Sequence, residues 1–435
     1  MSKEYEIIIR EKLQSVLSTS NGDGGSREVV VAFLGPNSAD LLLAVMACMN
    51  INGRLLPVLL NTRWTFQEIA QALTSQNNKQ SSDDTLLVHV GSDENHRRLL
   101  QRAADLLWQQ SKGRHHVSIF ELASISESYR EKAALPLQQQ QQGDSLKTSE
   151  PQMLVAALDA TKIVSDCRNR GYNDNNSVII NNDNGNYDDS HDTAIILFTS
   201  GTTSGSKGVL LSHRALYIQA LAKLGPPCFY DANTKMLATT VPLFHVGGLS
   251  STLAVLLAGG SLVFPPEQQQ QQQQQQTTIA AASSFQPDAV IQSIQQGPHL
   301  SSNTLVVVPA MLASLMDQLN NNSNSSSSRG FPWVRLVLIG GQSATPSLLQ
   351  HVFQRFPNAK VVQTYACTEG ASSLTFWERT PNEQLHSDGQ GPQEMPSGDC
   401  IGHPPSHISL CLFPTNADDS TVNTCLLYTS DAADE

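Results

Sequence analysis

A run of glycines, hydroxyl side chains and one lysine occupies residues 199–208, directly after the apolar segment Ala194–Phe198. Glycines let the backbone close around an anion, and main-chain N–H groups, hydroxyls and an ammonium group can all bind phosphate oxygens. A Walker A loop requires Gly-Lys-Ser/Thr, whereas Gly208 follows Lys207 here. The segment predicts a phosphate-binding loop of another type, with a surface loop of small residues as the alternative. The candidate phosphate ligands are Thr199, Ser200, Gly201, Thr202, Thr203, Ser204, Gly205, Lys207 and Gly208.

Three later segments also carry residues suited to chemistry. His245 lies in the segment Val241–Leu249, although a lone histidine there is more often a packed side chain. Glu369 ends the segment Gln363–Glu369, and Mg²⁺ is a hard ion that prefers a carboxylate together with phosphate oxygens. The glycine-rich segment Gly340–Ser343 follows an apolar strand.

Taken in their order along the chain, the segments resemble the signature motifs of the acyl-adenylate-forming (AMP-binding) superfamily. This superfamily includes acyl-CoA synthetases, firefly luciferase and peptide-synthetase adenylation domains. The resemblance covers roughly residues 29–412. It implies that Tyr365 stacks on adenine, Thr368 contacts the α-phosphate and Glu369 helps to hold Mg²⁺. It also implies a nucleotide site formed by the loop at 199–208 with Tyr365 and Thr368. The implied catalytic residues are Lys207, His245, Thr368 and Glu369, and the implied acyl-pocket residues are His245, Gly340, Gly341, Gln342 and Ser372.

Within the superfamily, several short strings resemble the branch of plant-type 2-succinylbenzoate–CoA ligases of phylloquinone and menaquinone biosynthesis. The strings lie at residues 61–65, 222–223, 245–251, 308–311, 372–376 and 405–408. The resemblance implies ATP, Mg²⁺, coenzyme A and a small-molecule carboxylic acid, here an aromatic acid with a succinyl arm. A ligase for a hydroxycinnamate or a fatty acid remains an alternative, as does a nucleotide-binding fragment without activity. Ala366 and Gln342 depart from the family pattern, which has glycine at both positions.

The composition excludes other classes of protein. The 435 residues carry a net charge of −12 with no basic stripe, so nucleic-acid binding is not expected. Seven cysteines form no C-x-x-C pair, which favours an intracellular, reducing compartment without structural zinc or disulfides; a plastid or peroxisome stays open. No run of 18 apolar residues occurs, so no membrane span is expected. The oligomeric state cannot be inferred from the sequence.

Apolar strands alternate with amphipathic helices, which predicts an α/β fold with parallel sheets covered on both faces. The resemblance implies the large N-terminal domain of adenylate-forming enzymes, with two αβαβα-type subdomains and a small β-barrel-like segment. The expected strands are 29–34, 54–60, 86–90, 117–120, 194–198, 239–243, 261–264, 289–291, 304–308, 334–339, 360–364 and 401–413. The expected helices are 6–17, 36–49, 64–73, 96–110, 214–224, 250–257, 309–319 and 345–356.

The expected organisation has three parts. Residues 1–27 form an N-terminal helix and loop, and residues 28–424 form the adenylating domain, with low-complexity insertions near 136–190, 266–278 and 320–328. Residues 425–435 resemble a translated sequencing adapter. The ribose-binding Asp, the hinge and the catalytic Lys of the family's small C-terminal domain are not found. We therefore expect a C-terminally truncated chain that is inactive in the full reaction.

Overall fold

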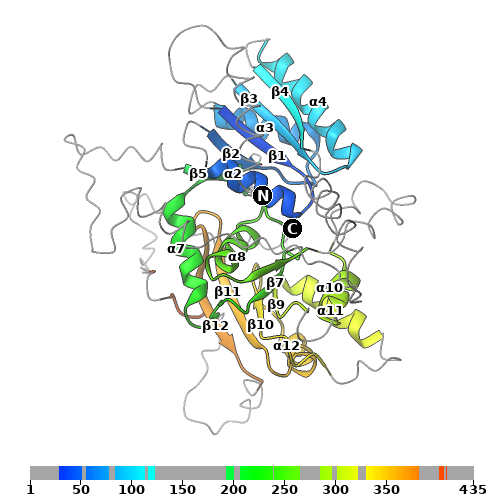
Figure 1. The fold of residues 1–435 in the computed structure, drawn as a ribbon, viewed down its shortest axis with the longest axis vertical. Coiled ribbons are helices and arrows are strands. Elements are labelled where there is room, and N and C mark those ends of the chain that lie inside the picture. The colour runs from blue at the N-terminus through cyan, green and yellow to red at the C-terminus, as the bar shows by residue number, and fades with distance from the viewer. Residues whose placement is uncertain are drawn as a thin grey trace, which may run out of the picture. The chain divides into compact units, whose positions relative to one another are not determined.

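The computed structural model describes residues 29–50, 55–77, 84–112, 116–122, 193–199, 206–238, 240–264, 285–295, 301–321, 330–381, 401–405 and 408. The chain divides into two compact units, and each contains a six-stranded sheet (Figure 1). The first unit is drawn largely in blue and cyan, and the second in green to orange.

The first sheet has the strand order β4-β3-β1-β2-β5-β6. Its strands are β1 (Val29–Leu34), β2 (Leu55–Leu59), β3 (Asp84–Val90), β4 (His116–Leu122), β5 (Thr193–Thr199) and β6 (Lys207–Ser212). Its helices are α2 (Ala39–Asn50), α3 (Phe66–Asn77) and α4 (Glu94–Gln110). Every residue of β1 is buried, as expected for a parallel strand covered on both faces.

Helices α3 and α4 pack on one face of this sheet, where Ile69, Leu73 and Leu100 meet alternate residues of β1. Helix α3 begins after a capping box, because the Glu68 carboxylate accepts from the Thr65 N–H over 2.6 Å and the Thr65 hydroxyl accepts from the Glu68 N–H over 3.3 Å. This box explains why the helix begins at Phe66 and not at the expected Trp64.

The second sheet has the order β12-β11-β10-β9-β7-β8. Its strands are β7 (Lys235–Leu237), β8 (Ser261–Val263), β9 (Thr304–Val307), β10 (Leu336–Ile339), β11 (Lys360–Cys367) and β12 (Ser372–Arg379). Its helices are α7 (His213–Leu224), α8 (Val246–Leu257), α10 (Pro287–Gln295), α11 (Pro309–Asn321) and α12 (Pro346–Arg355). All strand pairs in it are parallel except the pair of β11 with the edge strand β12.

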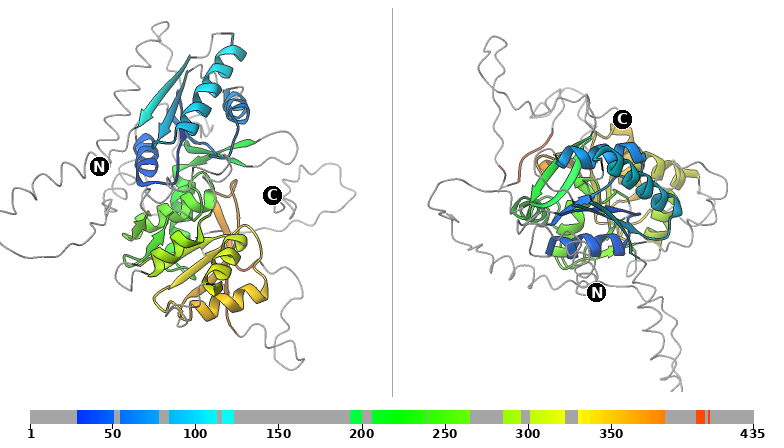
Figure 2. Two further views of the ribbon diagram at one scale, coloured as in Figure 1. Left: turned by 90° about the vertical axis from the view of Figure 1, so that its right-hand side faces the viewer. Right: turned by 90° about the horizontal axis from the view of Figure 1, so that it is seen from above.

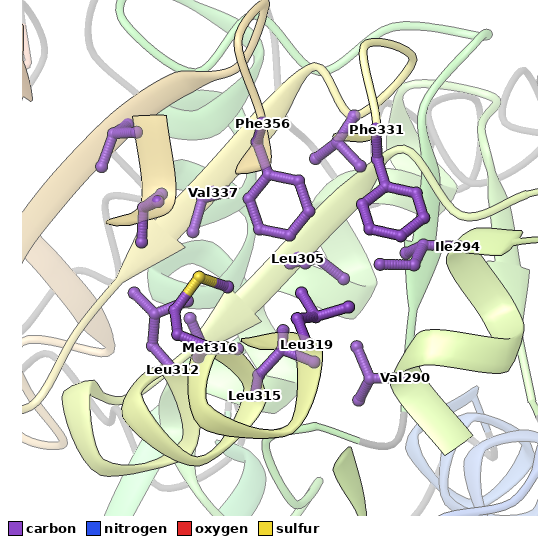
Figure 3. Packing of buried hydrophobic residues seen from close by; sticks show 14 of the residues in the cluster. Val290, Ile294, Leu305, Leu312, Leu315, Met316, Leu319, Phe331, Val337 and Phe356 are labelled. Atoms are coloured by element: carbon purple, nitrogen blue, oxygen red, sulfur yellow. The ribbon is translucent and has the colours of Figure 1, made fainter. Parts of the chain in front are cut away.

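Alternate residues of these strands face two separate cores. Val337 and Ile339 of β10 pack with helices α10, α11 and α12, as Figure 3 shows for Val337 beside Phe356 and Leu305. Leu336 and Leu338 pack with α7 and α8 on the opposite face. The yellow helices α10–α12 accordingly gather on one side of the sheet (Figure 2). This period-two alternation gives three layers, α/β/α.

The expected α/β class is confirmed, and most expected elements are present within one to four residues of their predicted ends. Two expected strands are wrong. Residues 240–243 form no strand, and the strand lies earlier at Lys235–Leu237, because Pro242 has no N–H to donate to a ladder. Residues 289–291 belong to helix α10, which begins at Pro287 and buries Val290 and Ile294 on one side.

Several expectations fall outside the described residues. They concern the N-terminal helix and loop, the glutamine and asparagine tracts, the tail from 425 and most of the segment 401–413. Of that last segment, His403 pairs with Phe376 of β12 in an isolated antiparallel bridge. Asn320 and Asn321, at the start of the expected insertion at 320–328, instead belong to the end of α11.

Candidate functional site

Three of the predicted motifs follow the carboxyl ends of parallel strands in the second sheet. Val241–Leu249 follows β7, Gly340–Gln342 follows β10, and Tyr365–Glu369 spans the end of β11. Because parallel strands end at the same edge of a sheet, these motifs share one edge, where open α/β sheets bind ligands. In the sequence, Gly340 follows His245 by 95 residues and Tyr365 follows Gly340 by 25, and the topology places all three motifs at one edge.

The loop after β10 is held between the ends of its two neighbouring strands. The Gly340 N–H donates to the carbonyl of Val307 over 3.0 Å. A side-chain Cβ at Gly340 would lie 3.4 Å from Thr364 Cγ2, and Gly341 adopts a φ of +86°, which favours glycine. Gln342, by contrast, is exposed and its φ is not positive, so a residue with a side chain fits where the family has glycine.

The β11–β12 hairpin carries the nucleotide motif at its turn. The ladder shifts register between Tyr365 and Ala366, a bulge of the kind that re-aims side chains beside active sites. Ala366 still pairs with Ser373 and has no positive φ, so its methyl group requires no strained backbone. Tyr365 and Thr368 are partly buried, while the Glu369 side chain is exposed at the turn. An exposed carboxylate in this place can bind a metal ion.

The turn itself is strained. The Ala371 N–H donates to the Thr368 carbonyl over 2.9 Å, and the Gly370 N–H donates to Cys367 Sγ over 3.2 Å. Ala371 has a φ of 56° and Ser372 a φ of 140°, conformations that side-chain-bearing residues rarely adopt. Such strain is concentrated at ligand-binding positions and must be stabilised by surrounding contacts.

His245 occupies the N-cap position of helix α8. Its backbone is extended, its ring is exposed, and the ring centroid lies 4.6 Å from that of the buried Phe244. The His245 N–H donates to the Pro242 carbonyl over 3.0 Å, which folds the turn back against the helix. The imidazole therefore lies at a helix N-terminus, at the edge of the sheet that carries the other motifs.

Of the phosphate-loop candidates that are described, Lys207 and Gly208 belong to the first unit and Thr199 to the second. Thr199 ends β5, and Lys207 and Gly208 begin β6; Ser200, Gly201, Thr202, Thr203, Ser204 and Gly205 lie outside the described residues. No strand was expected between the loop and the helix at 214–224, but β6 lies there in contact with α3, and its Leu211 is buried. Lys207 is exposed. That Lys207 and Glu369 hold one nucleotide stays a prediction.

Helix α7 supplies two buried polar residues to which the sequence analysis gave no role in the site, although Lys223 lies in the string 222–223. Gln219 and Lys223 lie four residues apart and so on one face of the helix. Gln219 Nε2 donates to the Gly370 carbonyl over 2.9 Å, and Lys223 Nζ donates to Ser250 Oγ over 2.5 Å and to Ser372 Oγ over 3.4 Å. The sequence signals that could have indicated this cluster are the string 222–223 and the position of a lysine among apolar residues of a helix.

Gln363 links the loop after β10 to the edge strand. This buried amide donates from Nε2 to Ser343 Oγ over 2.9 Å and accepts at Oε1 from Arg379 over 3.1 Å. Arg379 in turn lies over the ring of Trp377, 3.8 Å from its centroid. The loop Gly340–Ser343 is therefore positioned from both sides.

Comparison with a model of the AMP-binding enzyme family gives a match over residues 17–412. The chain belongs to the AMP-binding enzyme family. A chloroplastic/peroxisomal 2-succinylbenzoate–CoA ligase from Arabidopsis thaliana is 33% identical over 239 residues, which cover 54% of this chain and 38% of that protein. A 2-succinylbenzoate–CoA ligase from Bacillus cytotoxicus is 29% identical over 41% of this chain and 31% of that protein.

Two solved structures share the fold. The o-succinylbenzoate CoA synthetase MenE from Bacillus subtilis, in complex with the acyl-adenylate intermediate OSB-AMP, gives a TM-score of 0.51 at 19% identity and covers 93% of this chain and 57% of that one. VinN gives a TM-score of 0.51 at 15% identity, over 91% of this chain and 72% of that one. The large N-terminal domain of adenylate-forming enzymes is thus the fold of this AMP-binding chain.

Two further findings concern the described residues alone. None of their helices combines the length and apolar character needed to cross a membrane. They also contain no group of three or more His, Cys, Asp or Glu residues that could hold a metal ion. An ion bound at Glu369 would therefore need ligands from outside that part of the protein, which is the usual situation for Mg²⁺ with nucleotide phosphates.

Proposed function

We propose that this AMP-binding chain activates a carboxylic acid with ATP as an acyl-AMP, for transfer to coenzyme A, and that the acid is 2-succinylbenzoate. The observation that carries the proposal is the shared strand edge, where His245, Gly340 and the Tyr365–Glu369 hairpin follow parallel strands of one sheet. The substrate rests on the relatives, because matched curated proteins from a plant and from two bacteria are 2-succinylbenzoate–CoA ligases.

In the first step, the carboxylate of the acid attacks the α-phosphate of ATP, and pyrophosphate leaves. The acid is already ionised at neutral pH, so no strong general base is needed. Catalysis then consists mainly of positioning and charge neutralisation. Lys207 and the hydroxyls of the preceding loop would hold the β- and γ-phosphates, while Thr368 would donate to the α-phosphate.

The remaining roles are those that the resemblance to the family implies. Tyr365 would stack on adenine, and Glu369 would hold Mg²⁺, which neutralises charge that develops on the phosphates. The acyl pocket would comprise His245, Gly340, Gly341, Gln342 and Ser372. In the second step, the thiol of coenzyme A attacks the acyl carbon, and AMP leaves. Because the chain spans 38% of the plant relative, both steps are proposals.

The test is acid-dependent ATP–pyrophosphate exchange, which reports the first step alone. We expect exchange with 2-succinylbenzoate to exceed exchange with 4-coumarate or a long-chain fatty acid by at least tenfold. Higher exchange with 4-coumarate would show that the acid is a hydroxycinnamate and not 2-succinylbenzoate, since a 4-coumarate–CoA ligase also matches this chain. If none of these acids supports exchange and calorimetry detects no binding of MgATP, the adenylating function is contradicted.

A further inference from the structure

Lys223 is a buried cation whose partners in the described part of the chain are hydroxyl groups. Its side chain is 1% exposed, and its ammonium group bonds to Ser250 and Ser372 as described above. No Asp or Glu carboxylate in that part of the chain pairs with it. A buried charge is costly unless it is paired. An anionic group of a bound ligand could therefore pair with the Lys223 ammonium group.

The groups that face Lys223 do not supply a negative charge near neutral pH. Burial raises the pKa of the Cys228 thiol to about 12, and burial also raises the pKa of the nearby Tyr230 hydroxyl. Burial lowers the pKa of Lys223 itself to about 8. The ammonium form therefore still predominates at pH 7.

The position of Lys223 connects it to the proposed acyl pocket. Ser372 is a predicted pocket residue and adopts the strained φ of 140°, and Ser250 lies one turn along α8 from the His245 end. Gln219, one turn before Lys223 on α7, holds the carbonyl of Gly370 in the same turn. Three elements thus bring one ammonium and two hydroxyls to a single point that includes a residue of the proposed acyl pocket, Ser372.

We propose that Lys223, positioned by Ser250 and Ser372, binds the second carboxylate of a dicarboxylic acid, the one that is not activated. The inference rests on the proposed function and names its substrate class. An ammonium and two serine hydroxyls can each donate to a carboxylate oxygen, and charge-assisted hydrogen bonds are the stronger kind. Hydroxycinnamates and fatty acids have one carboxylate and would leave the buried charge unpaired.

The test compares two acids that differ in this one group. We would measure, by calorimetry with AMP and Mg²⁺ present, how the whole chain binds 2-succinylbenzoate and 4-oxo-4-phenylbutanoate, which lacks the ring carboxylate. The variants are Lys223→Gln, which retains hydrogen bonding without charge, and Lys223→Met. The control is Lys360→Met, which removes a partly exposed lysine of the same unit that pairs with Glu378.

Lys223→Gln should weaken binding of 2-succinylbenzoate by about 10- to 100-fold and that of 4-oxo-4-phenylbutanoate by less than about twofold. Lys360→Met should change neither. Equal weakening of both acids by Lys223→Gln would overturn the proposal and show a structural role only, with the ligase assignment intact.

A measurement on the unaltered chain does not depend on the folding of any variant. The preference for the dicarboxylate over the monocarboxylate should fall about tenfold between pH 7 and pH 9.5, as Lys223 loses its proton. A preference independent of pH, or equal affinity for both acids, would overturn the proposal. If the chain binds neither acid but binds 4-coumarate or a fatty acid, the proposed substrate fails as well.

Discussion

The side-chain amide of Gln219 donates a 2.9 Å hydrogen bond to the carbonyl of Gly370, the residue after Glu369. The two residues are 151 positions apart in the sequence, and Gln219 is buried. Helix α7 therefore fixes the turn on which the proposed metal ligand stands.

Replacing Gln219 with methionine should lower the free energy of unfolding by about 1–3 kcal/mol, because the Gly370 carbonyl would lose its buried donor. Urea denaturation followed by circular dichroism measures this. Leu221→Ala on the exposed side of the same helix serves as the control and should cost less than about 0.5 kcal/mol. A loss below that value for Gln219→Met would show that the bond contributes little.

Glu369→Gln should weaken Mg²⁺-dependent binding of ATP by about tenfold or more, because an amide is a poorer ligand than a carboxylate for this ion. Binding of AMP without metal should change little. Calorimetry with and without Mg²⁺ separates the two effects. Glu378→Gln, which alters another exposed carboxylate of the same hairpin, should leave both affinities unchanged. If ATP binding by Glu369→Gln depends on Mg²⁺ as strongly as in the unaltered protein, Glu369 is not a ligand of the ion.

The adjacent glycines at the start of α8 should respond oppositely to alanine. A Cβ at Gly248 would lie 2.3 Å from the Pro242 carbonyl oxygen, so Gly248→Ala should destabilise the protein by about 1–3 kcal/mol or more. Gly247 has nothing within 4 Å of the same position, so Gly247→Ala should stabilise the helix by up to about 1 kcal/mol. Thermal unfolding of the two variants measures this difference. Similar melting temperatures would contradict the close packing of Gly248 against Pro242.

The stability contribution of Lys223 should depend on pH. Its pKa is about 8 in the fold against an ordinary 10.5, so between these values the unfolded chain binds a proton that the folded chain does not. Stability due to this residue therefore rises with pH across that window. Relative to Lys223→Met, the unaltered protein should gain at most about 3 kcal/mol between pH 8 and 10.5.

Cys228 and Tyr230 titrate with the opposite sign above about pH 9, because burial raises both pKa values. Both groups are present in each protein, so the difference between the two unfolding curves isolates Lys223. A difference that stays constant within about 0.5 kcal/mol from pH 8 to 10.5 would contradict the lowered pKa.

The sequence was informative where a pattern is local. The buried runs Val29–Leu34 and Leu336–Ile339 are apolar on both faces and were predicted as strands. The edge strands β6 and β12 were not predicted, because Lys207–Ser212 begins inside a glycine-rich motif and Ser372–Arg379 mixes serines with charged residues.

The same distinction holds for the candidate site. His245, Gly340 and Glu369 stand in recognisable strings, so their types could be predicted together with their order. The contacts of Lys223 could not be predicted, because Ser372 lies 149 residues further along and approaches only when α7 packs on the sheet. Packing of distant elements decides which polar side chains become buried neighbours.

Glu369 lies in the turn between β11 and β12, and Ser372 is the first residue of β12 after that turn. Under the proposed roles, the metal–nucleotide site and the acid site therefore share the same short stretch of backbone. If the dicarboxylate raises the affinity for the nucleotide by some factor, the nucleotide must raise the affinity for the dicarboxylate by the same factor. A search for inhibitors that mimic the acid should therefore be run at saturating nucleotide, because the bound nucleotide then already fixes the conformation of the turn.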